Sequence, residues 1–299
     1  MLFRSKVEAL RLSTSYEKQW DTSMVSITPY VRMNSMELLA SFTLNADPTV
    51  SLSENNSYGL LAKWRRDFSS FMRARLIAGL DIDVSPGAHM EDSLNVSVTG
   101  AAPSRMFSAY SRAQRVYDYD VTFTGMSPYL HGELSPTERL RVTTGVRFDH
   151  LSYSMDNRLA GAPVFVAAGT PFPAARFYGQ VNSTDVSYRH VSPKFGATYA
   201  LGASTHLFAG YTHGFRAPSE GNLFRPAVGA SALAANAAAV AAAALNPIKA
   251  DQFEMGLRGR AGAVSYDVVL YDLAKRDDLV SQRDTVTTLT TTEIGRAHV

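Results

Sequence analysis

The segment from Leu140 to Asp149 alternates strictly between two kinds of side chain. Its even positions carry leucine, valine, threonine, valine and phenylalanine, and its odd positions carry arginine, threonine, glycine, arginine and aspartate. Successive residues of a β-strand point to opposite faces, so this pattern puts one face in an apolar medium and the other in water. Runs with the same alternation occur at residues 10–17, 25–33, 58–65 and 74–83. The chain is therefore expected to be all-β.

The connections between these runs alternate in length. Short turns are expected near residues 19–23, 66–72, 135–139, 200–205 and 260–263. Long loops are expected near residues 35–57, 84–115, 152–189 and 215–249. A soluble sandwich has no reason to place all its long loops at one end of its strands, whereas outer-membrane barrels have short periplasmic turns and long external loops. This asymmetry predicts a transmembrane antiparallel β-barrel, of which about ten strands are present.

Composition alone leaves a soluble β protein and a membrane barrel both open. The 299 residues have a mean hydropathy of -0.09, and 19% of them are charged. Charges interrupt every apolar run that contains large side chains, so no transmembrane helix is expected. A barrel also has near-neutral hydropathy, because only every second residue faces lipid.

The charge and the cysteine count exclude some classes of partner and site. The formal net charge is only +2, and the basic residues are scattered, so no nucleic-acid partner is expected. The chain has no cysteine, which excludes disulfides and thiolate metal sites.

Residues 227–245 form an alanine-rich stretch of low complexity. Its length resembles that of a membrane span, but alanine contributes little apolar area, and Ser231 and Asn236 interrupt the run. The stretch is expected to be a helical or mobile patch inside an external loop.

No catalytic or metal-binding constellation is found. The histidines have no metal-ligand spacing, and neither a phosphate loop nor a nucleophile elbow occurs. The pairs Asp81 with Asp83 and Asp277 with Asp278 resemble acid–base pairs, but water-facing strand ends carry such pairs routinely. The chain is not expected to be an enzyme, and no catalytic, cofactor-binding or metal-binding residue is assigned.

Aromatic residues cluster near the ends of the expected strands. They are Tyr16, Trp20, Tyr30, Trp64, Phe68, Tyr153, Tyr199 and Tyr211. The pattern is typical of the aromatic girdles at the two membrane interfaces, although ordinary β propensity produces a similar enrichment.

Several cations share the polar positions of their strands and are expected to face the barrel lumen. They are Arg65, Arg73, Arg75, Arg141, Arg147, Lys194 and Arg258. Two roles are open to them: guiding an anionic chelate, or pairing with Asp81, Asp149, Glu254 or a plug domain. Loop residues are equally plausible ligand contacts: Arg105, Tyr110, Arg112 and Tyr117. The ligand-binding residues are therefore left unassigned.

Four segments resemble the barrel of TonB-dependent outer-membrane receptors of the siderophore-receptor type. They are Gly214–Ser219 followed by Leu223 and Phe224, Asn246–Pro247 followed by Glu254, Gly256 and Arg258, Ser127–Leu130 with Gly145–Asp149, and Val264–Asp277. The family's Leu-Lys-Pro-Glu element appears here as Ile248–Asp251, which lacks the proline and the glutamate. The resemblance covers residues 6–292.

The resemblance implies a plugged barrel of roughly 22 strands, located in the bacterial outer membrane. It implies active uptake of a ferric siderophore or a similar scarce nutrient, driven by the TonB–ExbB–ExbD complex acting on a plug and box outside this sequence. Outer-membrane lipid is the other expected partner, and iron is expected to arrive already chelated. The alternatives are a passive outer-membrane channel or a surface-adhesin barrel without active transport.

Both ends of the chain read as translated sequencing adapter. Leu2–Ser5 is encoded by CTCTTCCGATCT, and Glu293–Val299 is encoded by GAGATCGGAAGAGCACACGTC, which carries the reverse-complementary core. We therefore expect adapter-derived flanks at 1–5 and 293–299, and part of the barrel domain at 6–292. A part of a barrel exposes unpaired backbone at its two outer strands, which lipid does not tolerate, so the piece is not expected to fold alone.

Overall fold

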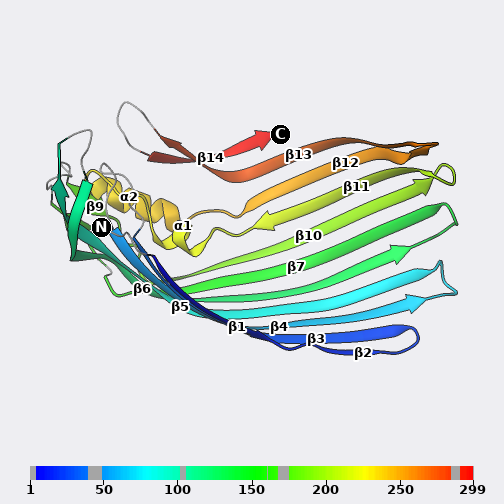
Figure 1. Ribbon diagram of the computed structural model, residues 1–299, viewed down its shortest axis with the longest axis horizontal. Coiled ribbons are helices and arrows are strands. Elements are labelled where there is room, and N and C mark those ends of the chain that lie inside the picture. Colours follow the sequence, from blue (N-terminus) through cyan, green and yellow to red (C-terminus); the bar gives the residue numbers. More distant parts are fainter. Residues whose placement is uncertain are drawn as a thin grey trace.

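A computed structural model describes residues 5–39, 49–101, 106–159, 161–167, 175–283 and 290–298, which form a long, curved antiparallel sheet with two helices at one end (Figure 1). In this part of the chain the sheet has 12 strands in the order β1-β3-β4-β5-β6-β7-β10-β11-β12-β13-β14, and β2 also pairs with β3. The bounds are β1 Lys6–Ser13, β2 Tyr16–Gln19, β3 Ser23–Leu39, β4 Thr49–Phe68, β5 Ala74–Thr99, β6 Met106–Leu134, β7 Leu140–Asn157, β10 Thr184–Ala200, β11 Thr205–Arg216, β12 Ile248–Ala261, β13 Val264–Arg283 and β14 Thr290–His298. The all-β prediction is confirmed, and the assignment of 293–299 as a flank stays a prediction.

The alternation in Leu140–Asp149 separates the two faces of β7. Gly145 and Asp149 are buried, whereas Val146 is exposed. The strand register places Val146 beside Leu130 of β6. We call the face that carries Asp149 the inner face and the face that carries Val146 the outer face. Hydrogen bonds between strands satisfy the backbone, which is why alternating strands of this kind can line a bilayer.

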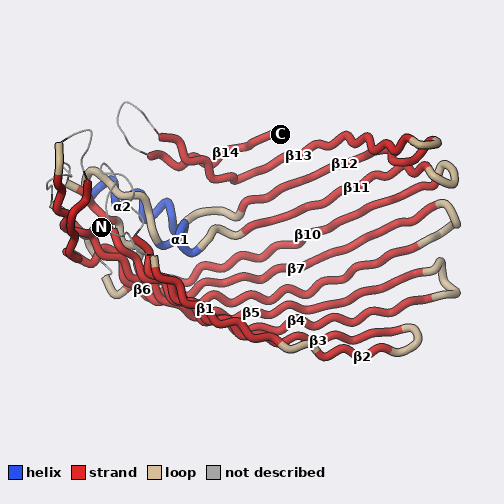
Figure 2. Tube along the Cα trace, viewed as in Figure 1, coloured by secondary structure: helices blue, strands red, loops and turns tan. Residues whose placement is uncertain are grey.

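The short turns all lie at one end of the sheet, as predicted. They occupy residues 20–22, 69–73, 135–139, 201–204 and 262–263, and Figure 2 shows them together at the right. The helices and the long connections lie at the opposite end. We call this opposite end the loop end.

The predicted loops at 35–57 and 84–115 were wrong in their bounds. β5 has 26 residues and β6 has 29, far more than the 9–11 that cross a bilayer. The two strands stay paired from Arg75 with Glu133 to Thr99 with Met106. Beyond the membrane both faces meet water, so the backbone ladder continues while the alternation that marks a strand in the sequence disappears.

The other two long connections have structure of their own. The first contains a two-stranded sheet of β8 (Val164–Val166) and β9 (Arg176–Tyr178). The second contains α1 (Glu220–Phe224) and α2 (Ala232–Ala243), which confirms a helix in the alanine-rich stretch. In the described ranges, no helix combines the length and the apolar character that a membrane crossing requires.

The girdle prediction was wrong for Tyr30. A Cβ added to Gly59 would lie 2.1 Å from the Tyr30 ring, so the ring fills the space that Gly59 leaves open. The Tyr30 hydroxyl donates to Asp83, which lies on the inner face. Trp64 and Tyr199, in contrast, pair with the outer-face residues Ala78 and Leu140, as a girdle requires.

Candidate functional site

The connection between β11 and β12, residues 217–247, folds back onto the inner face at the loop end. The Ser219 side chain caps α1 by accepting a hydrogen bond from the backbone N–H of Asn222 at 3.3 Å. The single turn that follows buries Leu223 and Phe224, with 0% and 2% of their surface exposed. The Gly214–Ser219 motif and the Leu223–Phe224 pair therefore end a strand and begin a buried helix.

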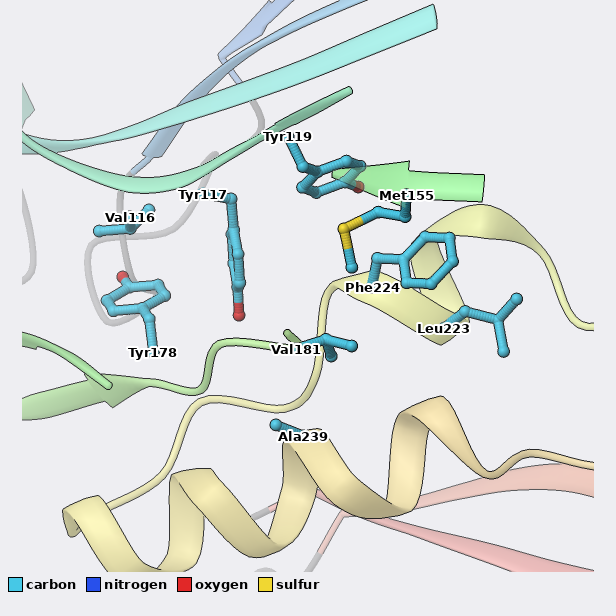
Figure 3. Close-up of a cluster of buried hydrophobic side chains, with 9 residues drawn as sticks. All are labelled: Val116, Tyr117, Tyr119, Met155, Tyr178, Val181, Leu223, Phe224 and Ala239. Atoms are coloured by element: carbon cyan, nitrogen blue, oxygen red, sulfur yellow. The ribbon is translucent and has the colours of Figure 1, made fainter. Parts of the chain in front are cut away.

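The buried side chains of this region form one apolar group, shown in Figure 3, which we call the mouth cluster. It consists of Val116, Tyr117, Tyr119, Met155, Tyr178, Val181, Leu223, Phe224 and Ala239. Phe224 meets Tyr119 and Tyr153 edge-on, with ring centroids 6.1 and 6.2 Å apart. Tyr153 therefore faces inward, and its assignment to the girdle was wrong.

Tyrosine hydroxyls from three strands bind the same connection. Tyr117 donates to the backbone oxygen of Pro226 at 2.9 Å, and Tyr153 donates to that of Pro218 at 3.2 Å. Tyr188 donates to the oxygen of Leu245 at 3.0 Å. Tyr119 donates to the carboxylate of Glu220, while burial first and this carboxylate second raise the pKa of the tyrosine. The first three bonds satisfy backbone oxygens of the connection.

A partly buried ion pair adds to these tethers. The Glu91 side chain is 6% exposed and lies 2.6 Å from the guanidinium of Arg225. His89 lies 3.4 Å from the same carboxylate and 2.9 Å from the Ser53 hydroxyl. Burial favours the neutral form of Glu91, but the hydrogen bond with His89 and the charge of Arg225 outweigh it, so the pKa of Glu91 is lowered.

Acid should loosen this connection. Because the pKa of Glu91 is lower in the folded state, its contribution is complete above the ordinary glutamate pKa of about 4.3 and is lost as the pH falls through the lowered value. Limited proteolysis of residues 217–247 in the full-length protein should therefore accelerate in that acidic range. Glu91→Gln should remove the pH-dependent part of the rate, and an unchanged profile in this variant would contradict the assignment.

The inner face below the mouth cluster is lined with ion pairs. Arg147 lies 2.7 Å from Asp81 and 2.8 Å from Asp149. Ser127 donates a further bond to Asp149 at 2.7 Å. Of the two predicted roles for Arg147, pairing with Asp81 and Asp149 is the one observed.

The other predicted lumen arginines on strands also have carboxylate partners. These pairs are Arg65 and Arg75 with Asp67, Arg141 with Glu133, and Arg258 with Asp267. The prediction was wrong for Arg73, which lies in the turn before β5. Lys194 lies on the inner face opposite Gly145, as predicted.

Three adjoining cavities form a continuous trough along the inner face of β7, β10 and β11. Their volumes are about 280, 440 and 530 Å³, from the short turns to the loop end. The first two share His131 and Lys194, and the last two share Arg147 and Ser192. We call this feature the inner trough. Its lining mixes charged and polar side chains with apolar ones.

The departure from the Leu-Lys-Pro-Glu element has a local explanation. Asp251 accepts hydrogen bonds from Tyr211 at 2.8 Å and from His213 at 2.6 Å. It also lies 2.9 Å from Arg276 of β13. Aspartate, whose side chain is shorter than that of glutamate, thus has three side-chain partners at this position.

The loop residues proposed as ligand contacts are dispersed. Arg105 lies outside the described residues. Tyr110 and Arg112 lie on β6 rather than in a loop, and Arg112 pairs with Asp92 and Glu37. Tyr117 is buried in the mouth cluster. Tyr119, Tyr188 and Arg225 were missed, because their partners lie far away in the sequence.

Asp81 and Asp83, one of the two carboxylate pairs considered for catalysis, are both bound by other side chains. Asp81 binds Arg147, and Asp83 binds Tyr30 and Arg32. Among the residues that the structure describes, no group of three or more histidine, aspartate or glutamate side chains could hold a metal ion.

Comparison with known proteins agrees with this geometry. The family model described as TonB dependent receptor-like, beta-barrel, matches residues 3–299. No curated protein matches the sequence.

Several solved structures share the fold at low sequence identity. The copper transporter OprC is 16% identical with a TM-score of 0.64, and the match covers 98% of this chain and 42% of OprC. The ferric citrate transporter FecA, in its unliganded form, is 17% identical with a TM-score of 0.62, covering 98% and 38%. The pyoverdine receptor FpvA from Pseudomonas aeruginosa PAO1, bound to pyoverdine, is 12% identical with a TM-score of 0.61, covering 98% and 41%.

The chain thus spans about two fifths of the length of these structures. Its open, curved sheet is the wall of a barrel, with short turns at one end and long, partly folded-in connections at the other. The family consists of receptors and transporters of the bacterial outer membrane. The chain belongs to the TonB-dependent receptor family and forms part of its outer-membrane β-barrel.

Proposed function

We propose that the protein takes up a ferric siderophore or a similar scarce nutrient across the outer membrane, with energy from the TonB–ExbB–ExbD complex. The observation that carries the proposal is the family match over residues 3–299. Among the similar structures, OprC is a copper transporter, FecA is a ferric citrate transporter, and FpvA is a receptor bound to pyoverdine.

The geometry of the wall supports the proposal. A connection of about thirty residues is fixed to the inner face at the loop end by an apolar cluster, four tyrosine hydroxyls and an ion pair. A compound that enters from outside therefore meets an ordered connection, and below it the inner trough.

Uptake by cells tests the proposal. The full-length gene is expressed in a strain without its own iron receptors, and uptake of ⁵⁵Fe is measured from iron(III) citrate, an iron(III) tris-catecholate and a neutral iron(III) trihydroxamate, with ⁶⁴Cu as a separate arm. We expect uptake of at least one of these, and its loss in a tonB deletion or after addition of a protonophore. Uptake that persists without TonB would favour a passive channel, and no uptake would contradict the proposal.

A further inference from the structure

Gly145 lies in the middle of the inner trough, buried beneath the Lys194 side chain. A Cβ added there would lie 2.6 Å from Cε of Lys194 and 3.3 Å from Nδ1 of His131. The lysine stem therefore occupies the space above Gly145, and the imidazole lies beside it on the other neighbouring strand. Both side chains line two of the three cavities. We call Gly145, His131 and Lys194 the Gly145 site.

Two polar groups at this site have no partner among the described residues. His131 Nε2 lies 3.4 Å from Glu133, but the buried Nδ1 has no hydrogen-bond partner there. The Lys194 ammonium has no carboxylate within ion-pair distance in the same part of the chain. Arg141 and Arg147, the other cations at this height of the trough, are each bound by carboxylates.

The difference between these cations has a chemical consequence. An arginine held by carboxylates is fixed, and its charge is offset. A free lysine is a mobile point charge with three donors, and in a cleft with low-dielectric walls it attracts anions. Passage requires binding that is favourable enough for entry and weak enough for release. A single lysine meets that requirement better than a cluster of arginines.

We propose that the Gly145 site is a relay on the inner wall for the oxyanion groups of an iron chelate in transit, and that the cargo is therefore a polyanionic chelate with carboxylate or catecholate oxygens. This inference rests on the proposed function. Lys194 supplies the charge, His131 supplies a polar ring atom beside it, and Gly145 lets the lysine stem lie against the strand. The site acts in passage along the wall and not in capture at the mouth cluster.

The experiment uses the full-length receptor in the cell-uptake assay with the same three iron chelates. Lys194→Gln should lower the maximal uptake rate of iron(III) citrate or the tris-catecholate roughly tenfold, the value of one charge-assisted hydrogen bond, and leave surface binding unchanged. Lys194→Arg should keep most of the rate. Gly145→Leu, which displaces the Lys194 stem from its place over the strand, should lower the rate as Lys194→Gln does.

A matched control is Lys63→Gln. Lys63 of β4 pairs with Gly79 on the inner face, outside the trough. Its replacement by glutamine therefore removes the same charge from another part of that face. It should leave uptake unchanged. Heat-modifiable gel migration should show that every variant folds.

Three results would overturn the relay. In the first, Lys194→Gln takes up polyanionic chelates at the wild-type rate. In the second, the variant loses uptake of polyanionic and neutral chelates equally and becomes sensitive to vancomycin, which would assign Lys194 to a carboxylate elsewhere in the receptor. In the third, the wild type transports only the neutral trihydroxamate or copper, which leaves the proposed function standing. Failure of all uptake by the wild type would contradict the proposed function itself.

Discussion

Phe224→Ala will release the connection between β11 and β12 from the inner wall of the full-length receptor. The Phe224 ring is 2% exposed and packs edge-on against Tyr119 and Tyr153. Removing a buried phenylalanine costs about 3–5 kcal/mol, because apolar contact is lost and a cavity remains. Hydrogen exchange of residues 219–245 should therefore accelerate by roughly a hundredfold or more.

The matched control is Leu233→Ala on α2. Leu233 is 81% exposed, so the substitution removes a similar apolar side chain without opening a cavity. Exchange in the same segment should stay within about twofold of the wild type. If Phe224→Ala also kept its protection, the tyrosine hydroxyls and the Glu91–Arg225 pair, not the mouth cluster, would hold the connection in place.

The sequence predicted the membrane wall well because lipid and water impose opposite requirements on alternate residues. The alternation of Leu140–Asp149 could arise only from two solvents, and the structure confirms the two faces. Above the membrane that requirement ends. The upper halves of β5 and β6 therefore carry no comparable pattern and were taken for loops.

The candidate site was harder to predict because its contacts join distant parts of the chain. Tyr117 and Pro226 are 109 residues apart, and Glu91 and Arg225 are 134 apart. Such pairs depend on the register of several strands and on irregularities such as the shift between Glu91 and Asp92. The girdle prediction failed at Tyr30 for another reason. An amphipathic ring suits either face of the sheet, and only the glycine at the paired position of the next strand indicates the inner face.

Leu80→Arg will destabilise the barrel in a bilayer far more than the same substitution at Leu61. Leu80 pairs with Ala62 and Pro128 on the outer face, where an arginine would enter hydrocarbon. The expected cost is about 2–4 kcal/mol near the middle of the membrane. Leu61 pairs with Asp81 on the inner face, at nearly the same height of the wall. An arginine there meets water and a carboxylate, so the expected change is below about 1 kcal/mol.

Refolding of the full-length protein into lipid vesicles, followed over a urea series by heat-modifiable gel migration, measures both costs. The two variants differ only in the face that receives the charge, which removes composition, net charge and strand propensity as explanations. Equal stability would mean that both faces meet the same solvent, which a barrel wall forbids. A large loss for Leu80→Arg alone would locate the hydrocarbon on the side of Val146 and water on the side of Lys194, the arrangement on which a polar passage along the inner trough depends.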